Sequence, residues 1–222
     1  AEDLGVEIEY DEITHINSAD GAFSLTSEDE EYQARSVIIA TGTKPRKLDL
    51  ANEDNLVGRG ISYCATCDGG FYKGKAVAVN GGGNSALHEA LYLSGICEKV
   101  YLVHRRDEFR ADAALVDKVK AKDNIELVLN ANIIKLNGEK HLESIETDNG
   151  HTINVDGLFV SIGRIPNAAG LVDGLNLVDD YINSGEDCPT NIPGIFVAGD
   201  VRTKELRQLV TATSDGAIAA TA

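Results

Sequence analysis

KAVAVNGGGNSALHEALYLSG, residues Lys75–Gly95, changes character twice within a short distance. It opens with an apolar run typical of a buried strand, continues through consecutive glycines, and ends with apolar residues at helical spacing. A second strand-like run, KVYLVHRR, begins at Lys99. The pattern predicts a strand–turn–helix–strand unit, which belongs to the α/β class of folds.

The glycine-rich turn of this unit has small residues at a defined spacing, since Gly81, Gly83 and Ala86 fit Gly-x-Gly-x-x-Ala. In such a turn the first glycine permits a tight bend, and the second lets a pyrophosphate approach the backbone. The third small residue allows the helix to pack closely on the strand, and the phosphate lies at the helix N-terminus. Taken alone, the motif is also compatible with a glycine-rich turn that binds no ligand. The position of the motif between a strand and a helix favours a dinucleotide site.

The end of the second strand indicates which dinucleotide is bound. A unit that binds NAD places Asp or Glu about 20 residues beyond the glycines, where it contacts the ribose. This chain has HRRDEFR instead, so Arg105, Arg106 and Arg110 offer permanently charged donors to a 2′-phosphate. The alternative is an exposed basic turn in which Asp107 and Glu108 pair with the arginines. We favour NADPH, because the rest of the chain is strongly acidic.

The segment SYCATCDGG contains two cysteines, Cys64 and Cys67, followed directly by Asp68. If the CATC turn opens a helix, the helix N-terminus stabilises a thiolate on the first cysteine, as a redox dithiol requires. A carboxyl group beside the pair can donate or hold a proton if burial raises its pKa. The alternative, a zinc site, needs a second pair, and Cys97 and Cys188 are too far apart in the sequence to supply it. We expect Cys97 to be a small core residue and Cys188 to lie in a polar loop.

Composition limits the remaining possibilities. The chain has 222 residues, of which 43% are hydrophobic, enough for one large or two small globular domains. Its net charge of −16 argues against a nucleic-acid partner, which would require clustered Lys and Arg. No apolar run approaches the roughly 20 residues of a membrane span, and the 4 dispersed cysteines favour a reducing, cytoplasmic setting. The absence of methionine, including an initiator, indicates a fragment.

The C-terminal segment supplies a second candidate site. A thiol pair does not accept hydride efficiently from a nicotinamide, so a ring acceptor must mediate the transfer. Asp200 closes the predicted strand IFVAGD, at the strand end where ribose or ribityl hydroxyls bind in such folds. A helix beginning at about Gln208 can stabilise the negative charge of a reduced flavin. The alternative is an ordinary alanine-rich packing helix.

Several segments, in this order and over nearly the whole chain, resemble the low-molecular-weight, bacterial-type thioredoxin reductases. They are GRGISYCATCDGGFYKGK, GGGNSALHEALYLS, HRRDEFRA, GLFVSIGRIPN, GIFVAGDVR and RQLVTATSDGAIAA. The resemblance implies an α/β flavoprotein homodimer of two Rossmann-like three-layer domains, with the NADPH domain inserted in an incomplete FAD domain. We expect partial FAD-domain segments at residues 1–45 and 165–222, and the NADPH-binding domain with its redox motif at 46–164.

The resemblance also implies roles for individual residues. Cys64 and Cys67 would form the redox disulfide, with Cys67 nearer the flavin and Cys64 attacking the disulfide of thioredoxin or a thioredoxin-like protein. Asp68 would be the proton donor. The pyrophosphate and 2′-phosphate of NADPH would contact Gly81, Gly83, Ser85, Ala86, Arg105, Arg106 and Arg110. The other expected cofactor-binding residues are Thr41 and Gly42, together with the FAD contacts Asp200, Arg207, Gln208 and Leu209.

The family's N-terminal FAD-binding unit, with its own Gly-x-Gly-x-x-Gly, is not found in this chain. We therefore expect the chain to purify nearly colourless and to reduce no thioredoxin. Two alternatives stay open. An alkyl hydroperoxide reductase flavoprotein shares the Cys-x-x-Cys arrangement but favours NADH and lacks the arginines. A non-catalytic module that only binds NADPH is the second.

Overall fold

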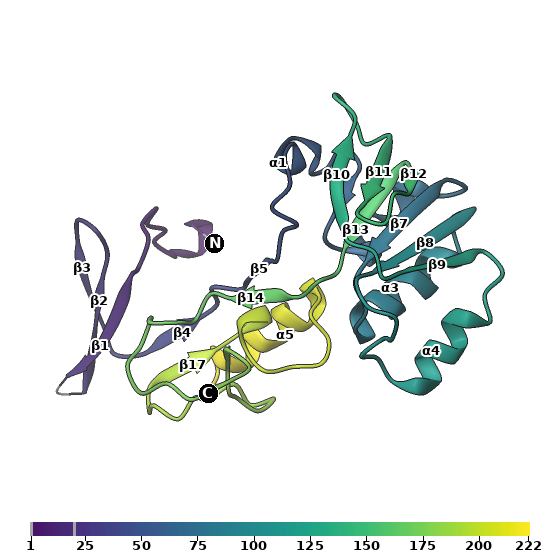
Figure 1. Cartoon of the computed structure of the whole chain (residues 1–222). Coiled ribbons are helices and arrows are strands. Elements are labelled where there is room, and N and C mark those ends of the chain that lie inside the picture. The colour runs from purple at the N-terminus through teal and green to yellow at the C-terminus, as the bar shows by residue number, and fades with distance from the viewer. Residues whose placement is uncertain (1, 20) are drawn as a thin grey trace. The chain divides into compact units, whose positions relative to one another are not determined.

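The computed structural model describes residues 2–19 and 21–222, and its elements are labelled in Figure 1. The chain divides into two compact units. Unit 1 comprises Ala1–Lys44 and Ile165–Ala222, and unit 2 comprises Pro45–Arg164. The boundaries expected from the sequence, after residues 45 and 164, lie within one residue of these. Unit 2 is therefore a continuous segment inserted in unit 1.

A parallel sheet forms the centre of unit 2. Its strand order is β6-β13-β7-β8-β9, and every neighbouring pair is parallel. The strands are β6 (Ile61–Ser62), β7 (Ala76–Asn80), β8 (Lys99–His104), β9 (Ile125–Leu129) and β13 (Gly157–Val160). Their near-continuous apolar sequences are typical of parallel strands covered on both faces. β7, α3 (Asn84–Ser94) and β8 confirm the predicted strand–turn–helix–strand unit.

Different layers cover the two faces of that sheet (Figure 1). On one face Val77 and Val79 pack in a buried cluster with residues of α3 and of α4 (Ala113–Lys120). On the other face Ala78 packs with an antiparallel sheet made of β10 (Ile133–Asn137), β11 (Ser144–Thr147) and β12 (Thr152–Asn154). Consecutive residues of β7 enter opposite clusters because side chains alternate across a strand. Unit 2 is thus a three-layer α/β structure.

Short helices precede β7 in unit 2. They are α1 (Glu53–Leu56), α2 (Ala65–Asp68) and the 3₁₀ helix η2 (Gly69–Tyr72). Gly69 lies where a Cβ atom would meet Leu93 and Tyr92 of α3 at 3.0 Å, so α2 and η2 run close against that helix. This packing places the CATC motif beside α3.

Unit 1 combines an antiparallel sheet with a pair of parallel strands. β1 (His15–Ala19), β2 (Ala22–Thr26) and β3 (Glu31–Ala34) form the antiparallel sheet. β4 (Val37–Ile39) pairs in parallel with β17 (Ile195–Val197), although the two are far apart in the sequence. The remaining elements are η1 (Glu2–Leu4), β15 (Leu177–Val178), β16 (Tyr181–Ile182), η3 (Gly199–Val201) and α5 (Leu209–Ala219). A core that includes Ile39, Ile195 and Val197 holds β4 and β17 in this unit.

The two segments that connect the units pair with each other. β5 (Thr43–Pro45) and β14 (Arg164–Pro166) form a two-stranded ladder. Backbone hydrogen bonds extend it at both ends, from Arg46 N–H to Gly163 O and from Asn167 N–H to Gly42 O, each 3.0 Å long. The chain therefore leaves and re-enters unit 1 along one narrow strip of paired backbone.

The cysteines outside the CATC motif are buried free thiols. Cys97 lies in the core between α3 and the sheet, as predicted. Cys188 lies in a loop with polar neighbours, as predicted, but the prediction did not include the burial of its side chain. Cys188 is fully buried, and its thiol contacts the backbone oxygen of Asp215 at 3.7 Å. Its acidic neighbours in the sequence do not indicate this burial, because the residues that pack around it, including Ala198 and Ala219, come from other segments. Among the described residues, no helix is both long enough and apolar enough to cross a membrane.

Candidate active site

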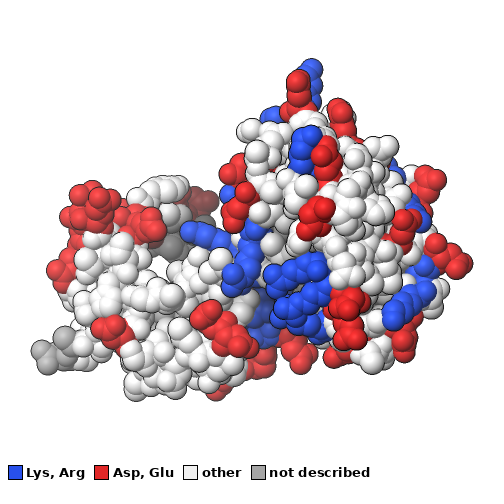
Figure 2. Space-filling model, in the orientation of Figure 1, with Lys and Arg blue, Asp and Glu red and all other residues white. Residues whose placement is uncertain are grey.

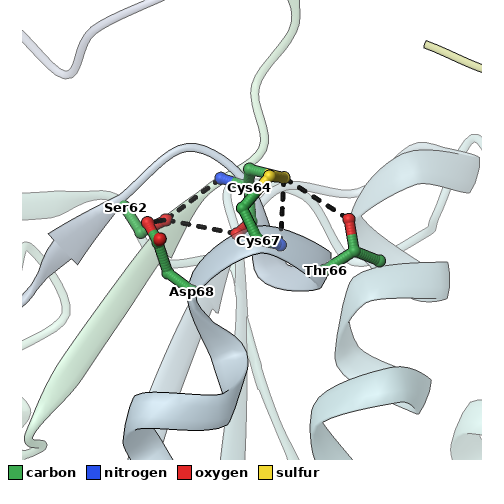
Figure 3. The surroundings of a disulfide bond; sticks show 5 residues. All are labelled: Ser62, Cys64, Thr66, Cys67 and Asp68. Atoms are coloured by element: carbon green, nitrogen blue, oxygen red, sulfur yellow. Dashed lines mark hydrogen bonds between the residues drawn. A yellow bond between two sulfur atoms is a disulfide. The ribbon is translucent and has the colours of Figure 1, made fainter. Parts of the chain in front are cut away.

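The CATC motif forms a disulfide at the start of a helix. Cys64 and Cys67 are bonded to each other, and Cys64 is the N-cap residue of α2 (Figure 3). The backbone N–H of Cys67 donates to Cys64 Sγ at 3.3 Å. The predicted helix is therefore present, and it directs an N–H group at the first sulfur. In a reduced pair this arrangement stabilises the Cys64 thiolate, because N–H groups and the helix dipole both favour negative charge there.

Asp68 reaches the redox turn through a serine hydroxyl. Ser62 Oγ donates to Asp68 Oδ2 at 2.6 Å. Ser62 Oγ also accepts a hydrogen bond from the Cys64 N–H at 3.1 Å. Figure 3 shows the Asp68 carboxyl turned toward Ser62, with the disulfide next to both. Sequence reasoning did not identify Ser62, although a hydroxyl two residues before the first cysteine was the available signal. The role of Asp68 as proton donor remains a prediction, and the geometry adds Ser62 as the connecting group.

The glycine-rich turn lies between β7 and α3. Two of its glycines, Gly81 and Gly83, lack a side chain for different physical reasons. A Cβ atom on Gly81 would come within 2.3 Å of Ser161 O and 2.7 Å of Ala86 Cβ, so only glycine allows this close packing. A Cβ atom on Gly83 would meet no atom within 4 Å. Open space at the N-cap of α3 fits a ligand that approaches the backbone. The N–H groups in the first turn of an α-helix have no acceptor within the helix. In α3 they include the N–H of the exposed Ser85, and such groups are suited to bind phosphate oxygens.

The arginine loop folds back onto that turn. Arg105 and Arg106 follow β8 directly, and the Arg110 N–H donates to Gly82 O at 2.8 Å. Asn84 and Asp112 exchange two further hydrogen bonds of 2.9 and 3.1 Å between the starts of α3 and α4. The guanidinium groups at all three arginine positions are exposed. The structure therefore places three exposed cations beside the turn expected to hold the pyrophosphate.

His104 is buried under the arginine loop. Its ring stacks on Phe109 with centroids 5.4 Å apart, and it occupies the space that a side chain on Gly82 would need. Burial lowers the pKa of His104, and the charges of the three nearby arginines lower it further. Neutral His104 therefore leaves the positive potential of this loop to the arginines. Figure 2 shows acidic side chains scattered over the drawn face among uncharged and basic ones.

In unit 1 the strand ends bring two turns together. β4 and β17 pair in parallel from Val37 with Ile195 to Ile39 with Val197, so both strands end at the same edge. Thr41 and Asp200 follow these ends. Thr41 Oγ1 donates to Asn167 O at 2.6 Å, which fixes the first of the two turns. The carboxyl ends of parallel strands are where nucleotide hydroxyls bind in such sheets, as we expect for Asp200.

The start of α5 lies next to the second turn. Gln208 is the N-cap residue, and its backbone N–H donates to Thr211 Oγ1 at 3.2 Å. Arg207 lies over the ring of Tyr181 at 4.1 Å and donates to Asp200 O at 3.3 Å. Leu209 is 83% exposed, which is unusual for a leucine that begins a helix. A planar apolar ligand at this helix terminus would cover it.

A buried ionic network, which sequence reasoning missed, holds these parts of unit 1 together. Asp215 of α5 accepts two hydrogen bonds of 2.9 Å from Arg202, one of 2.6 Å from Lys204, and one of 2.9 Å from the N–H of Gly199. Both Arg202 and Asp215 are almost completely buried. The only trace of this network in the sequence was the pair of opposite charges Arg202, in GDVR, and Asp215, in SDGA. The network fixes the Gly199–Asp200 turn to α5.

Comparison with known proteins agrees with this geometry. The family model described as pyridine nucleotide-disulphide oxidoreductase matches residues 2–216. A curated thioredoxin reductase of Listeria monocytogenes is 40% identical over 99% of this chain and 71% of the relative. The chain belongs to the thioredoxin reductase family of pyridine nucleotide-disulphide oxidoreductases.

Other thioredoxin reductases and one differently named protein also match. The crystal structure of thioredoxin reductase from Streptococcus pyogenes superposes with a TM-score of 0.89 at 36% identity, over 99% of this chain and 74% of that chain. A curated glucosaminate ammonia-lyase of Pseudomonas fluorescens is 40% identical over 99% of this chain and 73% of the relative. The fold, two Rossmann-like α/β domains with one inserted in the other, is that of the thioredoxin reductases.

As a member of this family the chain is an oxidoreductase whose cofactors are FAD and NADPH. The residues of unit 2 fit a dinucleotide, because the open N-terminus of α3 and the exposed arginines adjoin each other. Unit 1 fits a flavin in part. It has the two turns and the start of α5, but its sequence contains no Gly-x-Gly-x-x-Gly turn for the FAD pyrophosphate. The chain spans about 71% of its Listeria relative.

Proposed function

We propose that this chain is part of a thioredoxin-disulfide reductase, in which Cys64 and Cys67 form the disulfide that is reduced and re-formed. One observation supports this most strongly. The Cys64–Cys67 disulfide lies at the start of α2, which packs against α3, and the arginine loop after β8 reaches the turn before α3. A disulfide of purely architectural use would not require this combination.

When bound, FAD and NADPH supply the two electrons that open the Cys64–Cys67 bond. The residues of this chain then control charge and protons. The N–H groups at the start of α2 stabilise the Cys64 thiolate. That thiolate attacks the partner disulfide, which forms a mixed disulfide and releases one partner sulfur. Cys67 then attacks the mixed bond, which re-forms the internal disulfide and releases the second.

In this proposal Asp68 supplies the proton, and Ser62 holds the Asp68 carboxyl group in place. A released partner thiolate needs a proton, and the Asp68 carboxyl is placed near the pair by its hydrogen bond to Ser62. Arg105, Arg106 and Arg110 recognise the 2′-phosphate that distinguishes NADPH from NADH. The same arginines separate this proposal from an alkyl hydroperoxide reductase flavoprotein, for which we expect NADH and no such cluster.

The partner is proposed to be thioredoxin or a thioredoxin-like disulfide protein, as the names of the relatives suggest. A lyase, the activity named for one relative, transfers no electrons to a disulfide and has no need of the CATC pair. The expected homodimer and cytoplasmic location remain predictions.

Replacement of either redox cysteine tests the function. In the complete FAD-loaded protein, Cys64→Ser and Cys67→Ser should lower NADPH-dependent reduction of thioredoxin by at least about a thousandfold, because the dithiol cannot form. The assay follows NADPH absorbance with thioredoxin as substrate. Cys97→Ala, in the core of the same unit, is the matched control and should retain activity. Undiminished turnover in either serine variant would contradict the proposal.

A further inference from the structure

Glu53, the first residue of α1, is an acidic residue buried in unit 2. Only 2% of it is exposed, and its Oε2 atom has no hydrogen-bond partner among the described residues. A buried carboxyl oxygen without a partner costs free energy, and glutamate is seldom buried to this degree unless its other atoms are paired. The contacts of the other carboxyl oxygen therefore indicate why an acid occupies this position.

The Oε1 atom of Glu53 joins two segments of the chain. It accepts a hydrogen bond of 3.0 Å from the Leu48 N–H and one of 2.9 Å from the Tyr63 hydroxyl. Leu48 lies in the segment that enters unit 2 after β5, and Tyr63 immediately precedes Cys64. Burial and the hydrogen bond to Glu53 raise the pKa of the Tyr63 hydroxyl above its ordinary value, so this group stays a donor. One oxygen thus connects the entering segment to the residue before the redox disulfide.

Ser62 and Tyr63 hold the chain before the disulfide in two different ways. The Ser62 hydroxyl contacts Asp68 and the Cys64 N–H, which ties the redox turn to itself. The Tyr63 ring packs on the buried cluster between the parallel and antiparallel sheets of unit 2, and its hydroxyl reaches Glu53. The tyrosine therefore ties the redox turn to a segment outside it.

We propose that Glu53 is a positioning residue of the redox pair, and that its two hydrogen bonds hold the chain before Cys64 in the position that the closed disulfide requires. These two bonds are called the Glu53 anchor below. Closing a disulfide costs less conformational entropy when the two thiols are already held near each other. In the dithiol, a fixed Tyr63 keeps Cys64 from moving away from Cys67. The anchor therefore favours the disulfide over the dithiol.

Closure of the disulfide and formation of the Glu53 anchor are linked equilibria, so their coupling is reciprocal. If the anchor favours the disulfide, the disulfide stabilises the anchor by the same factor. The redox state of Cys64 and Cys67 then changes the strength of the hydrogen bond at the Leu48 N–H, in the segment that enters unit 2. This inference goes beyond the proposed function, and it rests on the cycling of Cys64 and Cys67 between disulfide and dithiol.

The first experiment measures the thiol–disulfide equilibrium of the chain in glutathione buffers. Two glutathione thiols become one glutathione disulfide as the Cys64–Cys67 bond opens and takes up two electrons and two protons. Tyr63→Phe, which removes the hydroxyl and keeps the ring, should shift this equilibrium about fivefold toward the dithiol. Acid quenching, alkylation of free thiols and mass spectrometry measure the two forms. An equilibrium constant equal to that of the wild type would overturn the proposal.

Two control variants separate the anchor from general effects on unit 2. Tyr101 is also a partly buried tyrosine packed against the same cluster, so Tyr101→Phe should leave the equilibrium constant unchanged. Asn124→Ala removes hydrogen bonds to Ser94 O and Cys97 O and should lower stability without shifting the thiol–disulfide equilibrium. An equal shift in Asn124→Ala would attribute the effect to lost stability and overturn the proposal.

Replacements of Glu53 test whether its hydrogen bonds are responsible. Glu53→Gln keeps an acceptor oxygen for Leu48 and Tyr63, so its equilibrium constant should stay within about twofold of the wild type. Glu53→Ala loses the acceptor and should shift toward the dithiol as Tyr63→Phe does. The double variant should shift no further than either single variant, because both remove one anchor. Equal shifts in Glu53→Gln and Glu53→Ala would overturn the role of the hydrogen bonds.

Amide hydrogen exchange in the unaltered chain measures the reciprocal effect. Reduction by dithiothreitol, which is oxidised to its cyclic disulfide, should speed exchange at the Leu48 N–H about fivefold, the same factor as in the glutathione equilibrium. The Val100 N–H, which donates to Asn124 O in the same unit, is the control and should exchange at an unchanged rate. Equal Leu48 exchange rates in the oxidised and reduced chain would overturn the coupling.

These measurements need neither flavin nor thioredoxin, so their failure is distinguishable from failure of the proposed function. Loss of turnover in Cys64→Ser, together with an unshifted equilibrium in Tyr63→Phe, would sustain the proposed function and reject only the Glu53 anchor.

Discussion

At the residue scale, the strongest energetic constraint in unit 1 is the buried network around Asp215. Burial by itself would raise the pKa of Asp215, but hydrogen bonds from Arg202, Lys204 and the Gly199 N–H outweigh it and hold that pKa well below its ordinary value. A lowered carboxyl pKa means that the network stabilises the fold at neutral pH and loses this contribution in acid.

Asp215→Asn should therefore lower the free energy of unfolding by about 3 to 5 kcal/mol at pH 7, because Lys204 would stay buried without a countercharge and Arg202 would keep only the exposed Glu186. The difference from wild type should narrow as the pH falls below about 4, where the aspartate of the unfolded chain is protonated. Urea unfolding followed by circular dichroism measures both effects. Asp54→Asn, which breaks only the exposed pair with Lys47, is the control and should cost less than about 1 kcal/mol. Equal costs in the two variants would show that burial of the network has no energetic importance.

At the element scale, the turn before α3 combines a structural requirement at Gly81 with a binding requirement at Gly83. Gly81 is required by packing against Ser161 and Ala86. Gly83 has φ −100° and open space around it, so alanine can adopt its backbone conformation without steric conflict. Only a ligand that approaches the backbone gives Gly83 a reason to lack a side chain.

Gly83→Ala should change the free energy of unfolding by less than about 0.5 kcal/mol and weaken NADPH binding about tenfold or more. The added methyl group would occupy the space of the pyrophosphate. Fluorescence titration with NADPH measures affinity, and thermal unfolding measures stability. Gly216→Ala, also in open space but inside α5, is the control and should leave NADPH affinity unchanged. If Gly83→Ala binds NADPH as well as the wild type does, the assignment of this turn is wrong.

At the scale of the whole molecule, unit 2 is one continuous segment with its own buried clusters on both faces of its sheet. The chain enters and leaves it through the paired strands β5 and β14. A continuous segment with its own core is expected to fold alone. Unit 1, by contrast, needs both of its separate segments to pair β4 with β17.

A segment containing residues 45–164 should therefore unfold cooperatively and bind NADPH within about threefold of the affinity of the whole chain. It should prefer NADPH to NADH, and combined Arg105→Ala and Arg106→Ala should weaken NADPH binding by about 2 kcal/mol or more with little effect on NADH. Calorimetry with both nucleotides measures this preference. Lys118→Ala and Lys120→Ala on exposed positions of α4 form the charge-matched control. Equal affinity for the two nucleotides in the unaltered segment would reject the assignment of the arginines.

Much of this arrangement could be predicted from local sequence. The spacing of Gly81, Gly83 and Ala86 between apolar runs predicts β7, the turn and α3, because each depends on neighbours in the chain. The helix of the CATC motif could be predicted for the same reason, because it also depends on neighbouring residues. Cys188 and Asp215 could not be placed this way, since their burial depends on segments that meet only after folding.

The sequence by itself therefore determined the α/β class, the glycine-rich turn between β7 and α3, the Cys-x-x-Cys pair and the family, because each depends on short runs of adjacent residues. The tertiary structure decided which distant groups share one environment. It placed Ser62 between Asp68 and Cys64. It also enclosed Asp215 with its cations. The physical reason is that burial and the electrostatic interactions that depend on it are properties of the packed chain, not of any single segment.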